Sequence, residues 1–294
     1  MLFIWRGSVL PRLLYRLSLL FALSLLVLYL NGIVFDYKIQ LNPAPFTLFG
    51  IALAIFLGFR NNVSFDRFWE GRKLWGALLN TTRSLARQAQ TLSELPADNK
   101  AIPRFVNLLI AFTYCCKHQL RNTDAGEDIG RLLGAADQAR FKDARYIPNL
   151  LVLEIGKWLK DLRNNQQIDT FLVANIDHNL NELSNIIGGC ERIASTPIPY
   201  TYKVLLHRTV YIYCFLLPFG FVDSLGWMMP LIVTFIAYTF VALEAVADEL
   251  EDPFGTEPND LALNALCAMI ENTLREMLGE RLLEVPGHKD YNLD

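Results

Sequence analysis

Long apolar runs are the most prominent pattern along the chain. Residues 13–35 contain one charged residue, Arg16, and are long enough to cross the hydrocarbon of a bilayer, which takes about 20 apolar residues. Two further apolar runs cover residues 204–222 and 227–246, and the turn-forming residues 223–226 separate them. This pattern predicts one spanning helix near the start of the chain and a membrane hairpin of two more.

A secretory signal peptide is the alternative interpretation of the first run. Arg6, Arg12 and Arg16 precede its apolar core, as basic residues do in signal peptides. No small-residue cleavage pattern follows Leu30, however. We therefore expect the segment to remain in the mature protein as a spanning helix.

The second apolar run predicts a helix that leaves the membrane. Pro43 and Pro45 open it, it covers residues 46–59, and Arg60 ends it abruptly, so the run alone is short for a bilayer. The helical pattern nevertheless continues through residues 60–88, with Gly71 and Gly76 as its only helix-weakening residues. One long helix is expected to cross the membrane and continue into water.

The middle of the chain differs in composition, because charged and amide residues recur there every few positions. Apolar residues at helical spacing predict helices with buried faces, for example Leu108, Leu109, Phe112 and Cys116, or Leu172, Ile176, Leu180, Leu183 and Ile187. We predict an all-α membrane protein in which residues 1–90 form the first two spans, 91–200 a cytoplasmic helical domain, 201–250 the third and fourth spans, and 251–294 a turn and an amphipathic C-terminal helix.

Basic residues predict the orientation of these four spans. Arg6, Arg12 and Arg16 precede the first span, and Arg60, Arg67, Arg72 and Lys73 follow the apolar run of the second, whereas Lys38 is the only basic residue in the loops after the first and third spans. Basic loops stay in the cytoplasm. Both termini are therefore expected on the cytoplasmic side.

Composition excludes several classes of function. The chain is 52% hydrophobic with a net charge of −3, which gives no basic surface for nucleic acid. Its five cysteines are odd in number and lack CxxC spacing, so neither a disulfide framework nor a zinc site is predicted. No GxSxG, HExxH or P-loop pattern occurs, so we predict no enzyme, no cofactor and no metal site.

Three stretches together carry a resemblance to a known family. They are IWRGSVLPRLLYR at residues 4–16, LGF at residues 57–59 with Arg67, Phe68 and Trp69 following, and LEDPFGTEPNDL at residues 250–261. Their order and spacing resemble those of bestrophins, and the short C-terminal segment resembles the bacterial branch. Each stretch alone is unspecific.

The resemblance implies a homo-pentamer in the inner membrane of a bacterium, with a central pore lined by the second helix of each subunit. It also implies passive ion flow. Bacterial members are known for conducting sodium and potassium and animal members for conducting chloride, so the resemblance predicts a monovalent cation channel. The alternatives are a chloride-selective channel of the same architecture, a non-conducting membrane scaffold or a coupled carrier.

Ile51, Ile55 and Phe59 match the neck residues of the family. They recur every four residues, so they share one helical face over about 12 Å of axial rise. Around a five-fold axis they would form three stacked apolar collars, and a narrow apolar throat gates ions by expelling water. The spacing alone agrees equally well with a stripe that packs against another helix.

Polar residues follow the neck on the same helix. Asn62, Asp66 and Glu70 recur one turn apart and predict a polar strip that attracts cations; the alternative is an ion-paired, solvated helix face. The family also has a second constriction at its cytoplasmic exit, for which we identify Ile168 as the candidate. The alternative role for Ile168 is that of an apolar residue packing at a helix start.

Acidic residues near the end of the fourth span allow two further interpretations. Glu257 and Asp260 match carboxylate positions of the calcium clasp in animal members, but the clasp's amino-terminal contributor has no counterpart here, so we predict no calcium gating. Glu244, Asp248 and Glu249 lie near the inner end of the span. Arg6 or Arg67 is the partner expected for them.

Overall fold

The computed structural model describes residues 8–39, 41–96 and 99–284 of the chain. Within these residues it is helical apart from a small β-hairpin. The elements are α1 (Leu10–Tyr29), β1 (Ile33–Val34), β2 (Tyr37–Lys38), α2 (Pro43–Thr91), α3 (Ala101–Arg121), α4 (Gly126–Leu133), α5 (Ala135–Phe141), α6 (Ile147–Asn164), α7 (Thr170–Ser195), α8 (Tyr200–Leu225), the 3₁₀ helix η1 (Gly226–Met228), α9 (Met229–Glu251) and α10 (Leu263–Met277).

The chain folds as two compact units, and α2 contributes to both. The first unit comprises the described residues up to Phe68 together with Pro197–Asp252, and the second comprises Trp69–Thr196 together with the described residues from Pro253 onward. The division thus falls inside α2, whereas the sequence analysis divides the chain at residue 90, close to the end of that helix.

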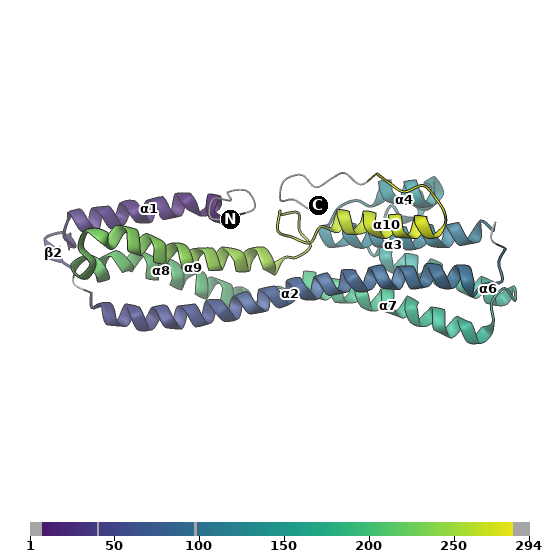
Figure 1. Cartoon of the computed structure of the whole chain (residues 1–294), viewed down its shortest axis with the longest axis horizontal. Helices are drawn as coiled ribbons and strands as arrows, with labels where there is room; N and C mark the ends of the chain where they lie inside the picture. Colours follow the sequence, from purple (N-terminus) through teal and green to yellow (C-terminus); the bar gives the residue numbers. More distant parts are fainter. Residues whose placement is uncertain (1–7, 40, 97–98, 285–294) are drawn as a thin grey trace. The chain divides into compact units, whose positions relative to one another are not determined.

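The first unit is a bundle of α1, α8, α9 and the first part of α2 (Figure 1). Helix α1 packs against both α8 and α9, and these two pack against each other. Their shared core is made of aliphatic side chains, among them Leu17, Leu57, Val210 and Val233. At one end of the bundle, Lys38 Nζ of β2 forms an ion pair of 2.8 Å with Asp223 Oδ1 near the end of α8.

The hairpin between α1 and α2 was not predicted. Ile33 pairs with Lys38 and Val34 with Tyr37 in antiparallel register, so Phe35 and Asp36 form the two-residue turn. Both have positive φ, 49° and 66°, as a type I′ turn requires. The turn pair Phe35-Asp36 is not the Asn-Gly or Asp-Gly pair that normally signals such a turn, so the sequence predicts only a polar link here.

Among the residues that the structure describes, three helical stretches are long and apolar enough to cross a membrane: Leu10–Tyr29, Pro43–Thr91 and Tyr200–Glu251. The last stretch contains α8, η1 and α9. Its two long helices, α8 and α9, pack against each other, in agreement with the predicted membrane hairpin. The predicted long second helix is confirmed, since α2 runs without interruption for 49 residues. Its first turn is held by Asn42, whose side-chain oxygen accepts a hydrogen bond from the Ala44 amide at 2.9 Å.

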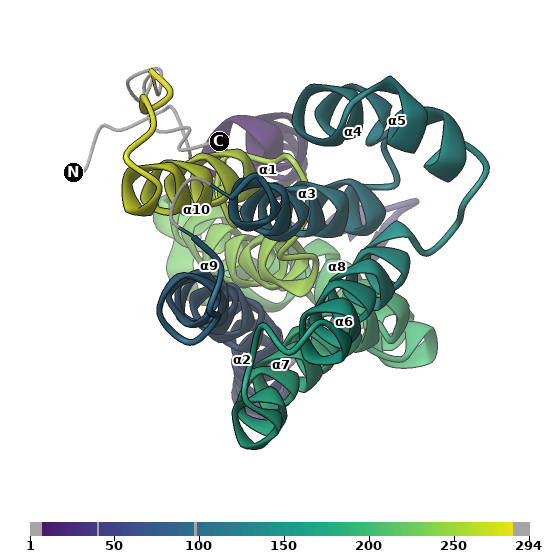
Figure 2. The same ribbon diagram turned by 90° about the vertical axis from the view of Figure 1, so that its right-hand side faces the viewer.

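The second unit is built around α3, which packs against α4, α6, α7 and α10 (Figure 2). Leu108, Leu109, Phe112 and Cys116 are buried, which confirms the predicted stripe on this helix. Ile176, Leu180, Leu183 and Ile187 are likewise buried on α7. Gly71 of α2 lies against the Phe254 ring, where an added Cβ would sit 3.1 Å from a ring carbon, so a glycine permits this contact.

A buried carboxylate ties α10 to the rest of the second unit. Glu271 accepts hydrogen bonds from Arg131 at 2.7 and 3.1 Å and from Arg275 at 2.7 Å. Burial alone would raise the pKa of Glu271, but these bonds and one with Tyr114 outweigh it and lower the pKa. The charged form of Glu271 therefore stabilises the fold above the carboxylate's ordinary pKa, and this contribution is lost as the pH falls below it.

Candidate functional site

Helix α2 attaches to the first unit by one narrow seam. Leu53, Leu57, Arg60 and Ser64 recur at intervals of three or four residues, and all four are buried. Leu53 and Leu57 belong to the core shared with α1, α8 and α9. Side-chain hydrogen bonds support the attachment, because Tyr202 and Tyr213 of α8 donate to the carbonyl oxygens of Phe56 and Phe46.

The predicted neck residues lie on the opposite side of this helix. Ile55 and Phe59 are each two residues from Leu57, which turns them about 200° away from the seam, and Ile51 has the same relation to Leu53. Ile51, Ile55 and Phe59 are 56%, 53% and 59% exposed. The described residues of the subunit therefore leave this stripe largely uncovered.

The predicted polar strip is only partly available for ions. Asn62 and Asp66 are exposed and continue the face of Ile55 and Phe59, and Asp66 forms no ion pair with any described residue. Glu70 instead accepts a hydrogen bond from Arg192 of α7 as part of an ion pair. Glu70 thus fits the alternative of an ion-paired helix face, because its charge is already matched.

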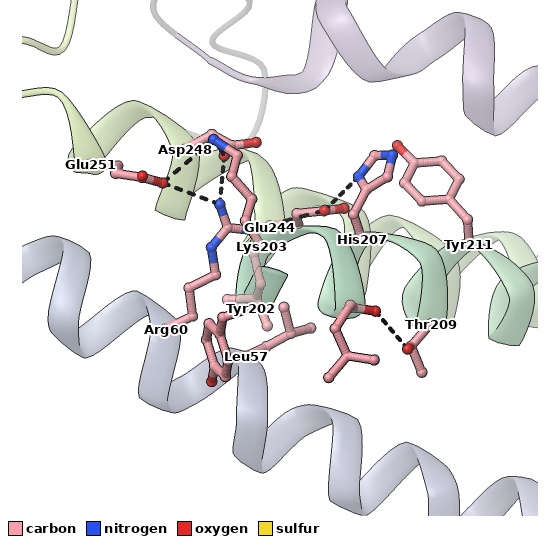
Figure 3. Close-up of polar contacts among 12 residues, drawn as sticks. Leu57, Arg60, Tyr202, Lys203, His207, Thr209, Tyr211, Glu244, Asp248 and Glu251 are labelled. Carbon is pink, nitrogen blue, oxygen red and sulfur yellow. Dashed lines mark hydrogen bonds and ion pairs between the residues drawn. The ribbon is translucent and has the colours of Figure 1, made fainter. Parts of the chain in front are cut away.

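A buried arginine holds the seam to α9 (Figure 3). The Arg60 side chain is fully buried, and its Nη2 donates to Asp248 Oδ1 at 2.5 Å and to Glu251 Oε2 at 3.4 Å. Its Nη1 lies 3.9 Å from Glu244 Oε1. Arg60 therefore meets three carboxylates that lie along one side of α9, which is how an arginine can be buried among apolar helices without a prohibitive cost.

Helix α8 completes this cluster with two further basic side chains. Lys203 Nζ lies 2.7 Å from Asp248 Oδ1 and 3.4 Å from Glu251 Oε2, and His207 Nδ1 lies 2.7 Å from Glu244 Oε1. Figure 3 shows all of these side chains converging between α2, α8 and α9. Three carboxylates thus face two permanent cations and one histidine, so the cluster is close to neutral.

The partners of the acidic residues differ from the prediction. Glu244 and Asp248 pair with Arg60, whereas Arg67 donates through Nε to the backbone oxygen of Glu251 at 3.0 Å. Arg6 lies outside the described residues, and Glu249 pairs with Arg12 at 3.4 Å. The sequence did contain a signal for the Arg60 pairing that the prediction missed. Arg60 follows Leu53 and Leu57 at helical spacing on the same face of α2, which indicates that it is buried with them.

Ile168, the candidate for the cytoplasmic aperture, is buried within the single chain. It is 5% exposed, in the core of the second unit, and it directly precedes Asp169, which begins α7 by accepting a hydrogen bond from the Phe171 amide at 2.7 Å. Its role at an aperture stays a prediction. The burial fits the alternative of an apolar residue at a helix start.

Glu257 and Asp260 form a turn with each other. Asp260 Oδ2 accepts from the Glu257 amide at 2.7 Å, and the Asp260 amide donates to the Glu257 carbonyl at 3.0 Å. Among the described residues no group of three or more histidine, cysteine, aspartate or glutamate side chains is arranged to hold a metal ion. The two acids thus act as turn residues before α10.

Replacing Arg60 tests the importance of the buried cluster. We expect Arg60→Gln to destabilise the protein by about 3–5 kcal/mol, because three carboxylates lose their buried partner. Thermal unfolding of the purified protein in detergent measures this, with the exposed Arg72→Gln on the same helix as control. An unfolding temperature of Arg60→Gln equal to that of the control would show that the cluster contributes no stability.

The chain matches a family model over residues 1–276, and the description of that family is Bacterial/Fungal Bestrophin protein. Relatives are similar over nearly the whole length. A voltage-dependent anion channel-forming protein of Ralstonia nicotianae is 48% identical over 95% of this chain and 92% of its own length, and one of Escherichia coli K12 is 42% identical over 97% and 92%. These relatives are channel formers, so the chain is not an enzyme.

Solved structures agree with this similarity. A crystal structure of a bacterial bestrophin homologue from Klebsiella pneumoniae, carrying a point mutation, is 42% identical and matches with a TM-score of 0.87 over 92% of this chain and all of that one. A second crystal structure of that Klebsiella homologue, obtained by zinc phasing, matches with the same score. The fold, the family model and the relatives lead to one conclusion: the chain is a membrane protein that belongs to the bacterial and fungal bestrophin family.

Proposed function

We propose that this protein is an ion channel of the bestrophin type whose neck is formed by Ile51, Ile55 and Phe59 from several copies of α2. One observation carries the proposal: these apolar side chains are exposed on the face of α2 that is opposite the buried seam. A membrane helix held in this way presents its far face either to lipid or to copies of itself around an axis. Family membership favours the second arrangement, in which copies of α2 face one another around an axis.

The neck is proposed to control flow by dewetting. Three stacked apolar rings over about 12 Å form a throat in which an ion loses hydration without gaining ligands. The barrier depends on the width and polarity of the throat. A smaller or more polar side chain at Ile55 therefore lowers the barrier, whereas substitutions at the seam act on folding.

Anion conduction is proposed in place of the predicted cation selectivity. Relatives with 48% and 42% identity are named voltage-dependent anion channel-forming proteins, which supports the chloride alternative. The polar strip that was predicted to attract cations includes Glu70, whose charge is already matched by Arg192. The neck itself carries no charge, and the ring edge of Phe59 is the positive part of an aromatic quadrupole, which favours an anion.

The assembly and its orientation complete the proposal. Five copies around one axis would place α2 at the centre, with four spans in each subunit, in the inner membrane of a bacterium. Basic residues before α1 and in the later part of α2 support a cytoplasmic location for both termini.

Two alternative functions differ from a channel in what they would transport. A scaffold would show no flux, and a coupled carrier would require a second solute to move with the ion.

Shortening Ile55 tests the neck. In liposomes loaded with chloride, we expect Ile55→Ala to increase passive chloride efflux several-fold, because a wider throat holds water more readily. Phe56→Ala is the matched control, since Phe56 is similarly exposed, at 50% against 53%, but lies about 100° around the helix. Equal efflux from the Ile55→Ala and Phe56→Ala proteins would contradict the assignment of the neck.

Selectivity is tested by reversal potentials in planar bilayers. With a potassium chloride gradient, we expect the reversal potential to be shifted from zero toward the chloride equilibrium potential. In Asp66→Asn it should lie closer still to the chloride equilibrium potential, because a ring of negative charges is removed. Glu70→Gln, whose charge is already paired, is expected to move it less. A wild-type reversal potential on the potassium side would reject anion conduction and restore the cation prediction.

A further inference from the structure

An apolar cavity of about 570 Å³ lies between α1, α8 and α9, away from α2. Its size is in the range of specific small-molecule sites. Aliphatic and aromatic side chains make up most of its wall, chiefly Leu17, Leu20, Leu23, Phe215, Ala237 and Val241. Leu19 and Phe215 are each 54% exposed, so the cavity is open on the outer surface of the bundle, where a lipid can enter.

One cation lies in the wall of this cavity. Arg16 donates a hydrogen bond to the Tyr211 hydroxyl, and its guanidinium lies 5.5 Å from the centre of the Tyr211 ring. A phenol neutralises no charge, and among the described residues no carboxylate pairs with Arg16. The Tyr211 ring in turn lies 4.4 Å from that of His207, which fixes its position. The cavity thus combines an apolar wall with a single uncompensated positive charge.

The cation and the apolar wall follow one another along α1. Arg16 to Leu23 covers seven residues of α1, about 10 Å of rise, which is two thirds of the roughly 15 Å hydrocarbon thickness of one leaflet. On α8 and α9, Tyr211 and Val241 line the end of the cavity where Arg16 lies, and Phe215 and Ala237 each lie one helical turn further from that end. A ligand that fits is therefore an anion with an alkyl chain of leaflet length.

We propose that this cavity is a binding site for an anionic phospholipid of the bilayer, with one acyl chain between α1, α8 and α9 and its phosphate on Arg16 and Tyr211. Charge complementarity favours this occupant, because its phosphate supplies the anion that Arg16 lacks among the described residues. The basic residues around α1 assign the site to the cytoplasmic leaflet. The inference concerns lipid occupancy and is independent of which ion the channel conducts.

Native mass spectrometry of the detergent-solubilised oligomer tests this site by counting retained lipids. With phosphatidylglycerol and phosphatidylcholine of identical chains, we expect the wild type to retain phosphatidylglycerol preferentially, at up to one molecule per subunit. Arg16→Gln should weaken this retention roughly tenfold, because a charge-assisted hydrogen bond is lost. Arg208→Gln, a neighbouring exposed cation on α8, should leave it unchanged.

A second pair of variants tests the acyl-chain part of the cavity. Leu19→Trp should fill the cavity and reduce retention of both lipids, whereas Leu26→Trp, at a position 53% exposed on the same helix but outside the cavity, should not. Equal retention in Arg16→Gln and Arg208→Gln would overturn the proposal, as non-specific lipid contact predicts that result. A wild type that retains no lipid would also overturn it, because a neighbouring subunit would then cover the cavity.

Discussion

The burial of Arg60 is the constraint on which the arrangement of α2 depends. A guanidinium enclosed among apolar helices is tolerated only where carboxylates meet it, and three carboxylates on one side of α9 do so. Because Arg60 shares a face with Leu53 and Leu57, this cluster also fixes the rotation of α2 about its own axis. Rotation by half a turn would expose the charge to lipid and bury the neck residues.

Fixing that rotation has consequences for function. The face opposite the seam is left to Ile51, Ile55 and Phe59, whose exposed side chains suit a shared apolar throat. On the other side of the bundle, the same α8 residues link the cluster to the cavity, since His207 contacts both Glu244 and the Tyr211 ring beside Arg16. The buried cluster and the proposed lipid site therefore meet at α8.

The sequence predicted the helices well because their signals are local. Apolar length and periodicity are enough to predict α2 as one long helix and the buried faces of α3 and α7. Pairings between distant residues were not predictable in this way. Arg60 finds Asp248 across 188 positions, and Arg192 finds Glu70 across 122, so the periodicity of one helix cannot reveal either pair. For Ile168 an isolated apolar residue predicted an aperture, and nothing in the sequence indicated that this side chain is buried in the second unit.

Water accessibility of the α2 face tests the central claim most directly. The five native cysteines are buried, so single cysteines introduced at positions 51, 55, 59 and 62 can be followed with a water-soluble thiol reagent. The account predicts that the reagent modifies these positions in membranes and blocks ion flux. Protection of these positions from the aqueous reagent, together with their labelling by a lipid-soluble reagent, would place this face in the bilayer and contradict the account.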